Sequence, residues 1–123
     1  FSFGLTDYLN GYKSSGFVYS SMEEIPFWWE KLNQNTFFNS ALTKRWKQLR
    51  SSTLSDEVVM EMVEKFDREL EIAQENNFDK WSLLGQKEVW PNYYIGDTHQ
   101  DEVTYLQRWI SERAKWLDKQ WKN

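Results

Sequence analysis

The chain has no cysteine, a single histidine and only two prolines in 123 residues. Without cysteine there are no disulfide bonds, no thiolate nucleophile and no cysteine ligands for a metal ion. No run of apolar residues approaches the roughly 18 that a membrane-spanning helix requires, so the sequence predicts no membrane span.

A basic patch is also missing. The formal net charge is -4 and the isoelectric point is about 5.0. Lysine and arginine are scattered along predicted helices instead of forming a stripe. Because nucleic-acid-binding domains usually carry such a patch, the sequence argues against a nucleic-acid partner.

The sequence lacks the motifs of a conventional active site. It contains no Gly-x-Ser-x-Gly, no phosphate-binding loop and no His-Glu-x-x-His. His99 stands alone in the first turn of a predicted helix, where a surface residue is expected instead of a catalytic base. Asp97, His99 and Asp101 have the chemistry of metal ligands, but their spacing about a helix start does not bring them to one point. We therefore predict no catalytic residue and no metal ligand in this chain.

What the sequence does contain is aromatic residues, at 18% of the chain and including 8 tryptophans. Most of them fall at helical spacing on apolar faces, which favours an aromatic core. The alternative is a binding surface on which exposed Trp and Tyr contact a protein or stack on the pyranose rings of a glycan. Exposure on one open surface would favour the alternative for four residues: Trp28, Trp29, Trp116 and Trp121.

Hydrophobic periodicity predicts one mainly α-helical domain spanning residues 1–123. Residues 1–21 are rich in Gly, Ser and Asn and form a loop-rich lead-in, and residues 22–123 form an irregular bundle of about four helices. We expect these helices at residues 26–33, 36–51, 55–76 and 101–121. The third should end at Asn76-Asn77 and bury one stripe of residues: Val59, Met62, Val63, Phe66, Leu70 and Ala73.

The sequence predicts the residues that cap three of these helices. Asn35 or Thr36 suits the start of the second helix and Ser55 the start of the third. Thr98 with Asp101 forms a capping box before the last helix. Four basic residues crowd the end of the second helix, where a solvated face is favoured over a site for an acidic partner: Lys44, Arg45, Lys47 and Arg50.

A rigid aromatic turn precedes the last helix, and we expect the rest of the chain to pack around the two. Pro91 fixes its own φ and drives Trp90 towards an extended conformation. Gly96 and Asp97 suit a turn. The helix that follows carries one apolar face, formed by Val103, Leu106, Ile110, Ala114, Leu117 and Trp121.

This region resembles the C-terminal end of the CotH kinase family, the bacterial spore-coat protein H proteins and their relatives. The turn Trp90-Pro91-Asn92-Tyr93 carries the resemblance together with a spaced helical pattern. That pattern comprises Asp101, Glu102, Tyr105, Leu106, Trp109, Ile110, Arg113, Trp116 and Leu117. Phe3 and Gly4, within Phe1-Ser2-Phe3-Gly4, are similar to the tail of the family's metal-binding motif. The resemblance runs from Phe1 to Leu117.

The resemblance implies that the chain is the C-terminal helical part of a kinase-like fold and a fragment of a longer protein. The parent would phosphorylate secreted or spore-coat proteins with ATP and Mg²⁺, in a spore-coat or extracytoplasmic setting. Its metal-binding Asp would lie just before Phe1, so no cofactor is expected here and no catalytic residue carries over. The expected partners are the upstream kinase-like domain of the same parent and a protein substrate. Two alternatives are a helical binding module and a non-catalytic scaffold.

Overall fold

The computed structural model describes residues 12–17, 26–87, 89 and 92–122. These residues contain no strand and form five α-helices: α1 (Phe27–Gln34), α2 (Thr36–Arg50), α3 (Asp56–Glu69), α4 (Glu71–Lys80) and α5 (His99–Gln120). The predicted mainly helical class is therefore confirmed. None of these helices has the length and apolar character that a bilayer crossing requires. Four residues of the family resemblance lie outside the described residues: Phe3, Gly4, Trp90 and Pro91.

The predicted caps form as expected. The Asn35 side chain accepts a hydrogen bond from the backbone N–H of Phe38 at 2.9 Å. The Ser55 hydroxyl accepts one from a backbone N–H in the first turn of α3 at 3.3 Å. Thr98 and Asp101 form a complete capping box, because each side chain accepts a hydrogen bond from the other's backbone N–H. Local side-chain chemistry thus sets where three of the helices begin.

The third predicted helix is divided in the structure. Leu70 ends α3 and precedes α4, with φ of -94° and ψ of 1°. No Gly or Pro lies near Leu70, so helix propensity gives no warning of the division. The expected end at Asn76-Asn77 is also wrong, since α4 continues to Lys80. Asparagine has only a weak preference against helix interiors, which a helix of this kind tolerates.

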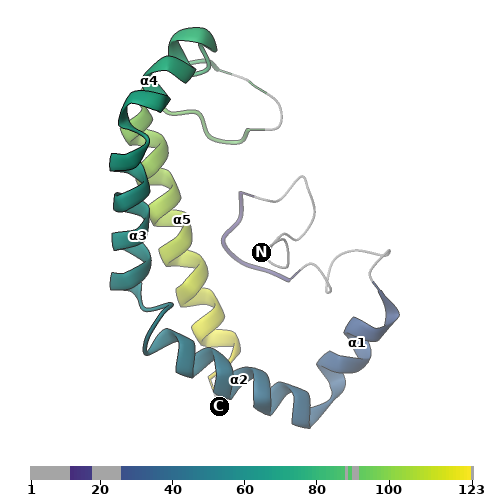
Figure 1. The fold of residues 1–123 in the computed structure, drawn as a ribbon. Coiled ribbons are helices and arrows are strands. Elements are labelled where there is room, and N and C mark those ends of the chain that lie inside the picture. The colour runs from purple at the N-terminus through teal and green to yellow at the C-terminus, as the bar shows by residue number, and fades with distance from the viewer. Residues whose placement is uncertain (1–11, 18–25, 88, 90–91, 123) are drawn as a thin grey trace.

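The helices form an irregular, open arrangement (Figure 1). α3 and α5 lie side by side and run in opposite directions, with α4 continuing beyond the end of α3. α2 crosses the far end of this pair, and α1 packs on α2 and leads away from α5. The frame is therefore a two-helix pair whose lower end is closed by a third helix.

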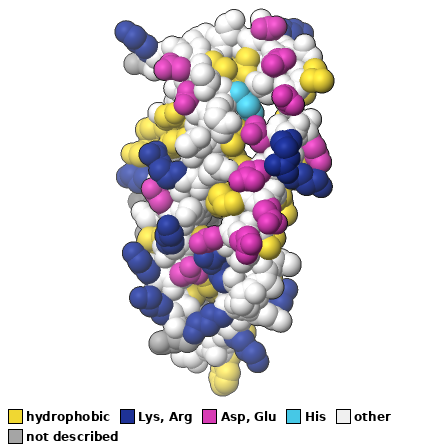
Figure 2. Space-filling model, turned by 90° about the vertical axis from the view of Figure 1, so that its left-hand side faces the viewer, with side chains coloured by type: hydrophobic (Ala, Val, Ile, Leu, Met, Phe, Trp, Pro, Cys, Tyr) yellow, Lys and Arg dark blue, Asp and Glu magenta, His cyan; other side chains and the backbone are white. Residues whose placement is uncertain are grey.

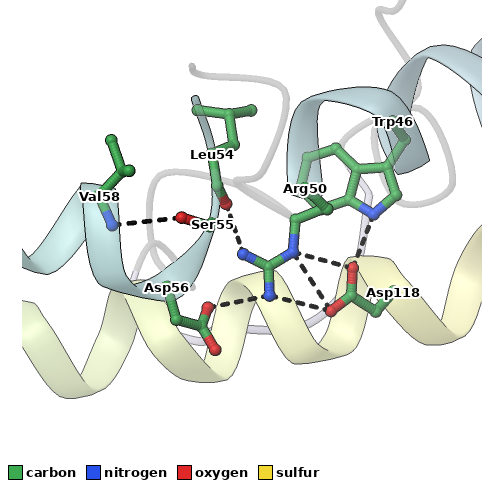
Figure 3. A network of polar contacts seen from close by, with 7 residues as sticks. All are labelled: Trp46, Arg50, Leu54, Ser55, Asp56, Val58 and Asp118. Carbon is green, nitrogen blue, oxygen red and sulfur yellow. Dashed lines mark hydrogen bonds and ion pairs between the residues drawn. The ribbon is translucent and has the colours of Figure 1, made fainter. Parts of the chain in front are cut away.

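One polar network joins α2 to both members of the pair (Figure 3). Arg50 donates from Nε and Nη2 to the carboxylate of Asp118 on α5, at 3.1 to 3.3 Å. Its Nη2 also lies 2.9 Å from Oδ1 of Asp56, the first residue of α3. Trp46 donates its indole N–H to Asp118 at 2.8 Å. Arg50 therefore does not belong to the solvated basic face that the sequence favoured.

Charge pairing changes the acidity of this arginine. Burial alone would lower the pKa of Arg50. Hydrogen bonds and charge attraction from Asp118 and Asp56 outweigh burial and raise the pKa above its ordinary value. The guanidinium is therefore held permanently charged at the point where the three helices meet.

A small aromatic cluster lies beside this network. Trp46 and Trp121 meet edge to face, with ring centroids 5.2 Å apart. Phe17 contacts Trp116 at 4.6 Å and Trp121 at 5.8 Å. The segment that contains Phe17 is thereby brought against the C-terminal half of α5.

The expectation of a buried aromatic core is wrong for the described residues. Val103 is the only apolar side chain among them that is buried, at 8% exposure. Phe37 of α2 is 86% exposed, and Phe66 of α3 is 52% exposed. Leu106, expected on the inner face of the last helix, is also exposed. The predicted stripes are apolar, but the neighbours that would cover them are not among the described elements.

The geometry of α3 explains which half of its stripe is covered. Val59, Val63 and Asp67 follow one another at helical spacing and are half-buried on the side of α5, where Asp67 contacts His99. Met62 and Phe66 lie roughly a quarter turn around the helix from that side and are exposed. Figure 2 shows apolar side chains lying open among acidic and basic ones on this face of the molecule.

Candidate functional site: an aromatic groove at the start of the last helix

The site is built on the short segment that leads into α5. The backbone N–H of Gly85 donates to the carbonyl of Gly96 at 2.9 Å, which ties the connector after α4 to this segment. Gly85 has a φ of +72°, a conformation that glycine adopts without strain. The N–H of Gly96 donates to Oε1 of Glu102 at 2.6 Å.

Gly96 is required for space. It is buried, and a Cβ at this position would lie 2.6 Å from Cβ of Asp101 and 3.0 Å from the carbonyl oxygen of Thr98. The sequence suggested a turn at Gly96, whereas the structure shows a close approach of the backbone to the first turn of α5. That approach fixes the segment containing Tyr93 and Tyr94 against the helix.

Two stacked tyrosine pairs line the site. The rings of Tyr12 and Tyr93 stack with centroids 3.9 Å apart. The rings of Tyr94 and Tyr105 stack at 4.2 Å and are almost parallel, at 7°. Trp109 donates its indole N–H to the backbone carbonyl of Tyr12 at 3.0 Å. Segments far apart in the sequence thus contribute to one aromatic surface.

Two open hollows adjoin this surface, and we call them together the aromatic groove. The first, of about 480 Å³, is lined by Tyr12, Phe78, Leu83, Leu84, Asn92, Tyr93, Tyr94, Ile95, Glu102 and Tyr105. The second, of about 440 Å³, is lined by Tyr12, His99, Glu102, Val103, Tyr105, Leu106 and Trp109. They share Tyr12, Glu102 and Tyr105, so the hollows lie next to each other. Each volume lies within the range of small-molecule sites.

The groove is mildly acidic. Among the described residues of its lining, Glu102 is the one carboxylate and no Lys or Arg is present, while Lys13 and Arg108 lie over the rings of Tyr12 and Tyr105. Partial burial raises the pKa of the Tyr94 phenol, and the charges of Asp101 and Glu102 raise it further. Tyr94 is therefore a neutral hydrogen-bonding group at physiological pH.

Several polar atoms in the lining are free to bind a ligand. Glu102 uses one carboxylate oxygen for Gly96, and within the described chain its second oxygen accepts no hydrogen bond. The same part of the structure gives no hydrogen bond to the side chain of Asn92 or to the lining tyrosine hydroxyls: Tyr12, Tyr93, Tyr94 and Tyr105. The groove thus combines aromatic faces with unpaired donors and acceptors.

His99 lies at the edge of the groove. Its Nε2 is 2.9 Å from Oδ1 of Asp67 on α3, and its ring lies 6.1 Å from that of Phe78. The expectation of a surface histidine is therefore wrong in part, because this ring is half-buried and joins α5 to α3. Within the described residues, no group of three or more His, Asp or Glu side chains could hold a metal ion.

Several of the resemblance residues that the structure describes line this groove, whereas Arg113, Trp116 and Leu117 lie farther along α5. Asn92 and Tyr93 line the first hollow and Trp109 the second. Trp109 is half-buried. The remaining groove residues were not predicted as a site, since tyrosines separated by up to about ninety positions carry no local signal. Only the density of Tyr near Asn92 hinted at it.

A second set of contacts anchors residues 12–17 to α5. Arg113 is buried, at 8% exposure, and its Nη1 donates to the carbonyls of Ser14 at 3.2 Å and Gly16 at 2.8 Å. Its guanidinium lies 4.6 Å from the ring centroid of Trp116. Burial lowers the pKa of Arg113. This arginine therefore holds a backbone segment without an ion pair among the described residues.

The four tryptophans whose exposure on one surface would favour a binding module form two separate groups of contacts. Trp28 and Trp29 meet edge to face on α1, with centroids 5.8 Å apart. Trp116 and Trp121 instead contact Phe17. Their arrangement does not single out one tryptophan surface, and the tyrosine-lined groove is instead an exposed aromatic surface with hollows.

The fold and the groove define an all-helical protein segment with an open aromatic surface at the start of its longest helix. The family model for the CotH kinase protein matches residues 1–117, and the chain belongs to this family. No curated protein and no solved structure matches the chain.

Proposed function

We propose that this chain is the C-terminal helical part of a CotH-like protein kinase, whose parent transfers phosphate from ATP to secreted or spore-coat proteins. Membership of the family supports the class of activity. In this proposal the chain supports the catalytic part of a kinase-like fold and is non-catalytic alone. Mg²⁺ and ATP would bind residues of the parent upstream of Phe1, and we assign no chemical step to the described residues, which form no metal site.

The observation that carries the supporting role is the anchoring of residues 12–17. Arg113 and Trp109 of α5 hold the backbone carbonyls of Tyr12, Ser14 and Gly16. This segment follows Phe3 and Gly4, the residues that resemble the tail of the family's metal-binding motif, by only a few positions. A helix that fixes the following segment would limit the motion of the motif itself.

The test is a thermal melt of this chain and of a chain extended upstream, each with and without Mg·ATP. A ligand at a hundred times its Kd stabilises a protein by about 2.7 kcal/mol, which is easily detected. Stabilisation of the longer chain alone is the expected result. Stabilisation of the short chain would place a nucleotide site among its own residues and contradict the proposal. If neither responds, the non-catalytic scaffold and the helical binding module become the favoured alternatives.

A second candidate function is binding of a glycan or protein partner through the aromatic groove. The supporting observation is the exposure of its aromatic rings, with Tyr93 59% exposed, beside unpaired polar atoms. The two candidates are compatible, because a kinase-like parent can carry a separate docking surface. A Tyr93→Ala variant of the full-length protein that keeps its melting temperature and loses partner binding would support this candidate. Unchanged binding would remove it.

A further inference from the structure

We infer that the aromatic groove binds a glycan of neutral pyranose sugars; the inference rests on the second candidate function and names its ligand. A pyranose ring offers an apolar face of C–H groups and a rim of hydroxyls. The groove offers the complement of both. Its rings are Tyr12, Tyr93, Tyr94, Tyr105 and Trp109.

The exposed rings provide stacking faces. Tyr12 and Tyr93 already stack on each other, so each has one face occupied, and both side chains remain more than a third exposed. Tyr94 and Tyr105 form the second pair. Lys13 lies over the ring of Tyr12 and Arg108 over the ring of Tyr105, so the stacking faces for a ligand are those of Tyr93 and Tyr94. Since each pair is held by its own stacking, little side-chain freedom is lost when a ligand arrives, which favours binding.

The unpaired polar atoms provide the hydrogen bonds. The four tyrosine hydroxyls and the Asn92 amide both donate and accept, as sugar hydroxyls do. Glu102 lines both hollows, and its second carboxylate oxygen can only accept hydrogen bonds. A ligand with many hydroxyl groups satisfies these atoms, whereas a purely apolar ligand would leave them unpaired at a cost.

The charge of the lining selects among glycans. The described lining contains Glu102 and no Lys or Arg, but Lys13 and Arg108 lie over the rings of Tyr12 and Tyr105, 5.7 and 5.4 Å from the ring centroids. Asp97 and Asp101 add negative charge close to Tyr94. These three carboxylates outnumber the two cations, so an acidic glycan is disfavoured and the groove suits neutral sugars. The two adjacent hollows, at about 480 and 440 Å³, together have room for more than one ring.

The experiment measures calorimetric binding of hexasaccharides to the full-length protein. The probes are neutral hexamers of glucose, xylose, mannose and N-acetylglucosamine, with hexagalacturonate as the acidic probe and hexalysine as a peptide probe. We expect at least one neutral hexamer to bind, and hexagalacturonate to bind more weakly. The Tyr93→Ala variant should bind at least about tenfold more weakly, as loss of a central aromatic contact does.

Two further variants make the result specific. Phe37→Ala removes an aromatic ring that is more exposed than Tyr93 and lies outside the groove, so it should bind like the wild type. Glu102→Gln keeps an oxygen for the N–H of Gly96 while replacing the free acceptor, so it should weaken binding without lowering the melting temperature.

The outcomes separate this inference from the function on which it rests. Binding of no neutral hexamer, or equal binding by Tyr93→Ala, overturns the glycan assignment. If hexalysine binds instead and Tyr93→Ala abolishes that binding, the groove serves a peptide and the second candidate function stands. If no probe binds, the glycan assignment is overturned and the second candidate function loses its support, while the kinase proposal is untouched.

Discussion

Arg50 joins three parts of the chain through one guanidinium. It contacts Asp118 at the end of α5, Asp56 at the start of α3 and the carbonyl of Leu54 between α2 and α3. Replacing Arg50 with Ala should lower the free energy of unfolding by about 2 kcal/mol, since hydrogen bonds to charged groups are lost but the two carboxylates are partly exposed. Urea denaturation of the full-length protein measures this change.

The control is Lys47→Ala, on the same helix. Lys47 is exposed and forms no side-chain contact among the described residues, so its removal should change stability by less than about 0.5 kcal/mol. Equal effects of the two substitutions would show that Arg50 acts only through its place on the helix surface.

Gly96 gives a second test at the scale of one residue. Its Cβ would overlap the side chain of Asp101 and crowd the carbonyl of Thr98, so Gly96→Ala should destabilise by about 1–3 kcal/mol through overpacking. At Gly85, whose added Cβ meets its nearest neighbour at 3.6 Å, the cost should be smaller and come from the positive φ alone. Thermal unfolding ranks the two variants, and the opposite ranking would contradict the packing argument.

At the scale of an element, the start of α5 depends on its capping box. Thr98→Ala removes the acceptor for the N–H of Asp101 and should cost about 1 kcal/mol. Thr104→Ala, one turn and a half along the same helix, removes only a hydroxyl bonded to the Gln100 carbonyl and should change stability by less than about 0.5 kcal/mol. Circular dichroism during a thermal melt compares them. A loss at Thr104 as large as at Thr98 would argue against the cap.

The sequence predicts what is encoded locally in each element. A cap needs residues within three or four positions of one another, so Asn35, Ser55 and Thr98 are visible without a structure. Helical periodicity likewise shows that α3 has an apolar stripe. It does not show which neighbour covers the stripe, and so Phe66 was expected inside and is exposed. Packing partners come from other elements and leave no local pattern.

The groove shows the same limit for a site. Asn92 and Tyr93 lie in the stretch that the sequence marks, and both line the groove. Tyr12 comes from the loop-rich start of the chain and reaches the groove through a hydrogen bond from Trp109 that spans 97 positions. The pairing of Arg50 with Asp118 spans 68 positions and is equally invisible. A single sequence does not show which distant residues contact each other, because it gives only their types.

At the scale of the whole molecule, α5 is the element to which distant segments are attached. α3 packs along it, α2 is tied to its C-terminal end through Asp118, and residues 12–17 lie on it. The expectation that the rest of the chain would pack around this helix is therefore confirmed in part, for α3, for the end of α2 and for residues 12–17. α1 is the exception, since it packs on α2 and leads away.

The attachment of residues 12–17 to α5 can be tested alone, because trypsin cleaves after lysine and this segment contains Lys13. Arg113→Lys keeps a positive charge and loses the guanidinium whose Nη1 reaches both Ser14 and Gly16. Release of the segment should speed cleavage after Lys13 by about tenfold, since a protease needs a locally unfolded chain and tenfold corresponds to about 1.4 kcal/mol. Arg108→Lys, on the same helix but over the ring of Tyr105, should leave that rate unchanged. Mass spectrometry of the fragments gives both rates. If the Arg113→Lys variant is cleaved no faster than the wild type, the guanidinium does not hold the segment. The supporting role proposed for α5 then loses the observation on which it rests.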